Sequence, residues 1–134
     1  MSRLLYEPDS PRGDKGKLVI NNRVPVNIPF VFNITEINDQ TNKPEPYIIS
    51  KDEYIKGTLK ENISYISKIF EFKYIDIINN TIVFSLDEKQ ISKLKQGMTY
   101  VLGFTLYNNQ NKPIKVLIKS LPVYIEPIVW KMNL

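Results

Sequence analysis

Cysteine and histidine are both absent from this 134-residue chain. The lack of cysteine excludes disulfides, a thiol nucleophile and a thiolate metal site. The lack of histidine removes the commonest general base and the commonest metal ligand of proteins. A nucleophile would have to be Ser, Thr or Lys, and the chain has no GxSxG motif. These absences favour a protein that is not an enzyme and that holds neither a metal nor an organic cofactor.

Alanine is absent as well. It is the best helix former, whereas Ile, Val, Tyr, Phe and Thr favour pleated sheet. Hydrophobic residues make up 43% of the chain and charged residues 24%, which is typical of a globular domain. A chain of this length corresponds to one domain with a core of its own. The composition therefore predicts a single β-rich domain.

The net charge is +4, and fifteen lysines accompany three arginines. The lysines are interleaved with Asp and Glu along the chain, whereas a nucleic-acid binder usually concentrates its cations on one face or tail. No apolar run approaches the roughly 18–20 residues of a membrane span, and residues 1–16 have no signal-peptide core. We therefore expect no membrane partner and a soluble protein made in a cytoplasm, and the charge pattern disfavours a nucleic-acid partner.

Composition along the chain divides it into three parts. Residues 1–16 are rich in Pro, Gly and mixed charge, which predicts an extended N-terminal arm. Residues 17–126 carry the strand patterns and are expected to form the domain. Residues 127–134 form a short C-terminal tail that holds the only Trp.

Residues 24–34 show the clearest strand pattern, because apolar side chains occupy every second position there. Pro25 and Pro29 fall on the opposite parity. Proline cannot donate to a ladder, so at least the first half of this segment is expected to be an edge strand. A short strand over 17–21 precedes it.

The middle of the chain alternates shorter strands with turns. A polar loop is expected over 36–46, then strands over 47–49 and 54–59, the latter with a candidate bulge at Gly57. Phe70, Phe72 and Tyr74 share one parity, which slips at Ile75 and Ile77 and indicates a bulge or a sharp bend. The pair Asn79-Asn80 predicts a tight hairpin turn, and 81–86 the returning strand.

One short helix is expected at about residues 88–95. Asp87 can cap its first turn, with Gln90 at the capping-box spacing. Ile91 and Leu94 would face the sheet, and Gly97 stands where a left-handed residue ends a helix.

Strand patterns resume after the helix and continue to residue 125. Alternation of apolar residues predicts a strand over 98–106, and the polar segment 108–112 predicts a hairpin turn. Two further strands are expected over 114–118 and 121–125, the first with Ile114, Val116 and Ile118 inward. About seven to nine short strands with regular polar turns predict an all-β, Ig-like antiparallel β-sandwich with one short helix.

Two groups of side chains invite a functional interpretation beside the structural one. Asn38, Asp39, Asn42 and Glu45 carry oxygen ligands suited to Ca²⁺, although their spacing is typical of a polar turn. Several tyrosines interleave with lysines, as on an oligonucleotide or sugar platform, although tyrosines are also common in sheets and interfaces.

From Ile75 onward the chain resembles small immunoglobulin-like virion domains of tailed bacteriophages, notably the N-terminal domain of phage baseplate upper proteins. The matching pieces are TIVFSL (81–86), the L-x-x-G segment 94–97, the aromatic strand 98–106 and the polar turn 108–112. The strand 24–34 is similar to the family's first core strand. A copy with an arm at each end is more similar to a capsid auxiliary (decoration) protein, or to a small adaptor of the neck or tail.

The resemblance implies a non-enzymatic structural protein of the virion, assembled in the host cytoplasm. Its arms would dock onto other virion proteins, such as the major capsid protein or neck and tail subunits. Apolar anchors and a cation in the arms are the expected partner-binding residues, and these are Leu4, Leu5, Tyr6, Arg12, Trp130 and Met132.

Three alternatives remain open at this point. The protein could be a baseplate, neck or tail adaptor, or a subunit that anchors a fibre. A carbohydrate- or receptor-binding module would show an exposed Tyr or Trp patch with converging Asn and Asp. A nucleic-acid-binding barrel would gather Lys and Tyr on one concave face.

Overall fold

A computed structural model describes residues 4–7, 17–21, 24–62 and 68–127, and for residues 4–7 only the backbone path is described. These residues form ten strands and one short helix, which confirms the all-β class. The elements are β1 (Leu4–Glu7), β2 (Leu18–Asn21), β3 (Val26–Val31), β4 (Asn33–Ile37), β5 (Pro44–Pro46), β6 (Tyr54–Lys60), β7 (Lys68–Tyr74), β8 (Thr81–Leu86), α1 (Glu88–Ile91), β9 (Thr99–Tyr107) and β10 (Pro113–Glu126).

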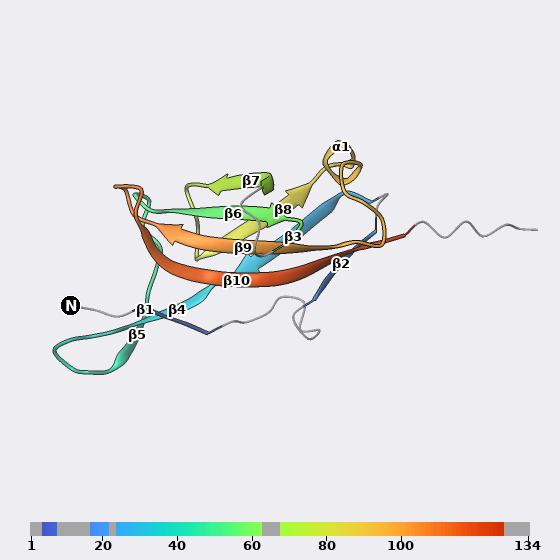
Figure 1. Ribbon diagram of the computed structural model, residues 1–134. Helices are drawn as coiled ribbons and strands as arrows, with labels where there is room; N and C mark the ends of the chain where they lie inside the picture. Colours follow the sequence, from blue (N-terminus) through green and yellow to red (C-terminus); the bar gives the residue numbers. More distant parts are fainter. Residues whose placement is uncertain (1–3, 8–16, 22–23, 63–67, 128–134) are drawn as a thin grey trace, which may run out of the picture.

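The strands form three sheets, and two of them face each other as a sandwich (Figure 1). The larger sheet has the order β2-β10-β9-β6-β7, and the strands β3 and β8 form the smaller one. The third sheet, β1-β4-β5, lies to one side of the sandwich, at the lower left of Figure 1. All described pairs are antiparallel except β2 with β10, which is parallel.

Alternate residues of the facing strands fill the core. Phe30 and Phe84 from the smaller sheet meet Phe104 of β9, with ring centroids 5.2 and 6.4 Å from the Phe104 centroid. Burying side chains of this size contributes roughly 1.5–3 kcal/mol each. The predicted inward positions of β8 and β9 are confirmed, since Ile82, Phe84, Leu86, Tyr100, Leu102, Phe104 and Leu106 are all buried.

The segment 24–34 is a strand that changes sheets. Its first part, β3, pairs with β8 alone among the described residues, so the predicted edge position is confirmed. Phe32 then breaks the ladder, and the chain continues as β4 in the third sheet. Val24 begins the alternating apolar set of this segment and would face inward by its parity, but it is exposed because it precedes the ladder.

Asp87 caps α1 as its sequence predicts. Its carboxylate accepts from the Gln90 N–H at 2.7 Å, while the Gln90 side chain accepts from the Asp87 N–H at 2.9 Å. Ile91 and Leu94 are buried, and Gly97 has a φ of 76°. The α-helix is shorter than predicted and ends at Ile91, because Lys93 and Leu94 turn to i−3 hydrogen bonds.

Several local predictions are wrong. The expected loop 36–46 contains β5 at Pro44–Pro46, and the expected strand 47–49 is not a strand. Gly57 is no bulge, because its pairing with Phe104 is in register. It instead makes room for a ring, since a Cβ there would lie 2.7 Å from Cε1 of Phe104.

The two strands expected over 114–125 are one strand, β10. Its pairing with β9 shifts register at three places, between Pro113 and Lys115, between Val116 and Ile118, and between Ile118 and Leu121. Each shift changes which residues face inward, so Leu117 is buried whereas Ile114 and Val116 are exposed.

Two changes of chain direction were predicted between β7 and β8, and both occur. Asn79 and Asn80 have φ values of 52° and 53°, and the Thr81 N–H donates to the Ile78 carbonyl, so the tight turn is confirmed. The returning strand of a hairpin is not, because β8 pairs with β3 and β7 pairs with β6. After Tyr74 the chain makes a sharp bend, with a φ of 52° at Asp76. None of the helices in the described ranges is long and apolar enough to cross a membrane.

Candidate docking surface

Strand β1 comes from the predicted N-terminal arm and completes the third sheet. It pairs antiparallel with β4, placing Leu5 opposite Thr35 and Tyr6 opposite Ile34. Strand β5 occupies the other side of β4. Pro44 and Pro46 leave β5 with few ladder donors, which discourages a further strand at that edge. The β1 edge carries no proline.

The loop between β4 and β5 is organised by Asn38. Its Oδ1 accepts from the N–H groups of Gln40 and Thr41, at 2.8 and 3.2 Å. Its Nδ2 donates to Glu45 Oε1 at 3.0 Å. Two of the four residues considered for Ca²⁺, Asn38 and Glu45, thus bind each other, and Asn38 also binds the loop backbone. No group of three or more Asp or Glu side chains that could hold a metal occurs in the described residues.

Asn80 joins the third sheet to the sandwich. It is buried, with 6% of its surface exposed. Its Oδ1 accepts from the Ile49 N–H at 2.8 Å, and its Nδ2 donates to the carbonyls of Phe32 and Tyr47 at 3.1 and 2.7 Å. The Asn80 side chain therefore hydrogen-bonds to backbone groups at the point where the chain leaves β3 and enters β4.

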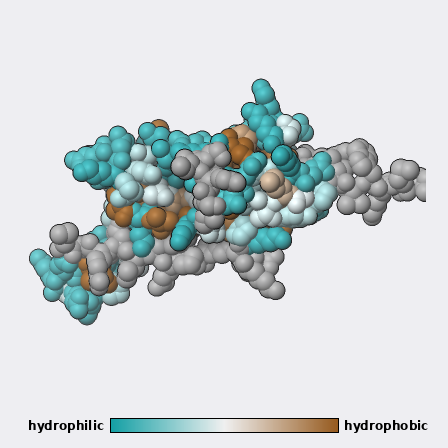
Figure 2. Space-filling model, in the orientation of Figure 1, coloured by the Kyte–Doolittle hydropathy of each residue, from teal (hydrophilic) through white to brown (hydrophobic). Residues whose placement is uncertain are grey.

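A hollow of about 320 Å³ lies at this junction. It is bordered by β4, by Tyr47 and Ile48 after β5, and by the Asn79-Asn80 turn. Ile48 is 63% exposed and Ile78, at the base of the same turn, is 73% exposed. These two isoleucines offer apolar contact surface at the junction, and Ile48 lines the hollow itself. Figure 2 shows apolar surface in separate patches, including one over the third sheet.

Tyr47 closes the inner side of the hollow. Its hydroxyl donates to Glu53 Oε2 at 2.6 Å, and Glu53 Oε1 accepts from the Ser50 N–H at 2.9 Å. Burial and this hydrogen bond raise the pKa of Tyr47 well above the ordinary range of tyrosine. The ring is therefore neutral and fixed across the physiological pH range. We name the third sheet, Tyr47, Ile48 and the 78–80 turn together the docking surface.

The structure brings together only part of the predicted partner-binding set. Leu4, Leu5 and Tyr6 lie in β1, within the docking surface. Arg12, Trp130 and Met132 lie outside the described residues.

Sequence reasoning missed Ile48, Ile78 and the role of Asn80. The Asn79-Asn80 pair indicated a turn, but nothing local showed that Asn80 reaches segments 31 and 48 residues away. Such contacts follow from topology alone.

Ser92 and Lys95 have the S-x-x-K spacing of some serine nucleophiles. In the structure Ser92 is the C-cap of α1, and its hydroxyl donates to the Lys89 carbonyl at 2.6 Å. This local hydrogen bond gives the serine a structural role.

The chain was compared with models of protein families, with curated proteins and with solved structures, and none of the three comparisons returned a match.

Proposed function

We propose that the protein is a non-enzymatic structural subunit that docks onto other proteins of a bacteriophage virion. The observation that carries the docking role is the third sheet. A strand from the N-terminal segment pairs with β4 outside the sandwich, beside a hollow with exposed isoleucines. The placement in a virion rests on the sequence resemblance described above.

The docking surface suits strand addition. A partner strand at the β1 edge would extend the sheet with main-chain hydrogen bonds, and the apolar rim would supply side-chain contacts. The prolines of β5 direct this addition to one edge. A capsid auxiliary role is the favoured version, and an adaptor of baseplate, neck or tail would use the same surface.

The test is incorporation into virions. A tagged copy is produced in host cells during assembly of the phage that encodes it, and particles are purified on a gradient. We compare the unaltered chain, a deletion of residues 1–7, and the double variant Ile48→Asp/Ile78→Asp. Both alterations are expected to lower incorporation about tenfold or more, while the thermal midpoint of the purified protein falls by only a few degrees.

The matched control is Val83→Asp. Val83 is 50% exposed on β8 and belongs neither to the third sheet nor to the lining of the hollow, so this charge should leave incorporation unchanged. Absence of the unaltered chain from particles would refute the virion role. Normal incorporation of the altered chains would refute the docking surface.

A further inference from the structure

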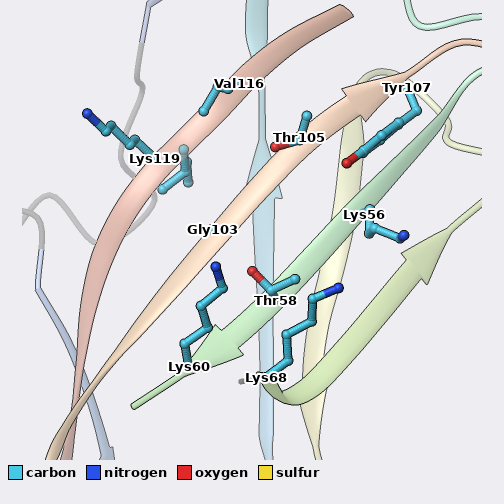
Figure 3. Close-up of a pocket in the computed structure, with 10 residues that line it drawn as sticks. Lys56, Thr58, Lys60, Lys68, Gly103, Thr105, Tyr107, Val116 and Lys119 are labelled. Atoms are coloured by element: carbon cyan, nitrogen blue, oxygen red, sulfur yellow. The ribbon is translucent and has the colours of Figure 1, made fainter. Parts of the chain in front are cut away.

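The outer face of the five-stranded sheet carries a cationic trough that shares no lining residue with the hollow of the docking surface. Outward residues of β6, β9 and β10, together with Lys68 at the start of β7, surround a hollow of about 350 Å³ (Figure 3). We name it the lysine trough. Its lining consists of Lys56, Thr58, Lys60, Lys68, Gly103, Thr105, Tyr107, Val116, Ile118 and Lys119.

Strand pairing explains why lysines and hydroxyls meet there. Lys56 lies opposite Thr105 and Thr58 opposite Gly103, while Lys60 lies opposite Lys68 on the other side of β6. Like charges placed opposite each other destabilise a sheet. A ligand of opposite charge would relieve that repulsion.

One carboxylate offsets part of this charge. Glu71 on β7 pairs with Lys68 and lies 3.4 Å from Lys56 Nζ. The two lysines lower the pKa of Glu71, so it is ionised at neutral pH. Lys60 and Lys119 have no ion pair among the described residues. Figure 3 shows Lys60 extending beside Thr58, while the Lys119 ammonium points away from the trough and its stem borders it.

The floor and one wall of the trough are shaped by the bulges of β10. A Cβ on Gly103 would lie 3.3 Å from the carbonyl oxygens of both Ile118 and Lys119. Glycine therefore allows the bent strand to lie close across the floor. The wall that β10 supplies is apolar, formed by Val116 and Ile118.

The tyrosines beside the trough do not offer a stacking platform for bases. Tyr54 and Tyr107 stack on each other, with centroids 5.2 Å apart and planes 6° apart. Lys73 Nζ lies 4.5 Å from the centroid of Tyr54. Single-stranded nucleic acid binding relies on free aromatic faces, and here each ring already has a ring or cationic partner.

We propose that the lysine trough binds an acidic carbohydrate. The anionic group, a sulfate, phosphate or carboxylate, contacts the ammonium of Lys60 and the neighbouring lysines. The hydroxyls of Thr58 and Thr105 bond to sugar oxygens, and the sugar's C–H face lies against Val116 and Ile118. This role is independent of the docking surface and of any place in a virion.

The test is calorimetric titration of the full chain with a heparin octasaccharide, with inorganic sulfate and with a dodecathymidylate. We expect binding of the octasaccharide and much weaker binding of the other two. The variant Lys60→Gln/Lys68→Gln should weaken octasaccharide binding about tenfold or more, since it removes two donors of charge-assisted hydrogen bonds. Thr58→Val should weaken it less.

The control variant Lys89→Gln/Lys95→Gln removes the same charge from the exposed helix region. It should leave octasaccharide binding nearly unchanged. If the control lost octasaccharide affinity equally, net charge alone would explain the effect, and the proposed site would be overturned. Equal or tighter binding of the dodecathymidylate would overturn the carbohydrate class, and no binding of any probe would overturn both.

Discussion

At the scale of single residues, two buried polar side chains have opposite effects on the stability of the fold. The amide of Asn80 has three backbone partners. The hydroxyl of Tyr74 is buried and has no hydrogen-bond partner in the described part of the chain. A satisfied buried polar group stabilises a unique structure, whereas an unsatisfied one costs free energy.

Asn80→Gly should lower the free energy of unfolding by about 2–4 kcal/mol. Glycine accepts the positive φ of this position, so the loss isolates the side-chain hydrogen bonds to Phe32, Ile49 and Tyr47. Urea unfolding measures the change. Asn79→Gly is the control and should leave stability unchanged or slightly higher, because Asn79 has a similar φ but an exposed side chain. If both variants lost the same free energy of unfolding, the side-chain hydrogen bonds of Asn80 would contribute nothing to stability.

Tyr74→Phe should raise the free energy of unfolding at pH 7 by up to about 1 kcal/mol, because it removes a hydroxyl that is desolvated without compensation. Tyr100→Phe serves as its counterpart. The Tyr100 hydroxyl accepts from the Lys95 N–H at 2.7 Å, so this variant should be destabilised. If Tyr74→Phe lost as much stability as Tyr100→Phe, the Tyr74 hydroxyl would have an important partner.

Tyr74→Phe should also change how the free energy of unfolding depends on pH. Burial raises the pKa of Tyr74 above its ordinary value near 10. The neutral form is therefore favoured in the folded state, so its contribution is complete below about pH 10 and is lost as the pH rises further. Urea unfolding between pH 8 and 11 should show a shallower decline for Tyr74→Phe than for the unaltered chain. If stability declined equally in both proteins, the raised pKa of Tyr74 would not contribute to the pH dependence.

At the scale of elements, sequence periodicity predicted strands well where the ladder is regular. The parity of β8 and β9 and the cap of α1 follow from local spacing, and the structure confirms them. Prediction failed in β10, because three register shifts change which residues face inward and no local pattern reveals these shifts. It failed in β5 because two prolines conceal a short edge strand.

The candidate site residues also fall into a part that local sequence predicts and a part that it does not. Leu4, Leu5 and Tyr6 were identifiable as apolar residues in a polar arm, and β1 contains them. The docking hollow and the lysine trough were not, since their residues come from strands far apart in sequence. Pairing of β6 with β7 and β9, together with the bends of β10, creates the trough.

Gly57→Ala should lower the free energy of unfolding by about 1–3 kcal/mol, because the added methyl would meet the ring of Phe104 in the centre of two packed strands. The double variant Gly57→Ala/Phe104→Leu should lose less than the sum of the two single changes, since each relieves the strain of the other. Thermal or urea unfolding of the four proteins measures the coupling. Strict additivity would mean that the ring and the glycine do not constrain each other.

At the scale of the whole molecule, the two proposed surfaces occupy different sheets. The docking surface is built on β1, β4 and β5, and the lysine trough on the outer face of the five-stranded sheet. The incorporation and titration experiments can therefore succeed or fail separately. A variant in one surface should leave the other assay unchanged.

The strand that runs from β3 into β4 has a mechanical consequence. A load applied to the third sheet passes along one covalent backbone into the ladder of β3 with β8, which extends from Val26↔Leu86 to Val31↔Thr81. Such a load acts along the strand, so the hydrogen bonds of the ladder are sheared together and do not open one after another. Tension between a docked subunit and the rest of an assembly would thus load the six residue pairs of this ladder at once.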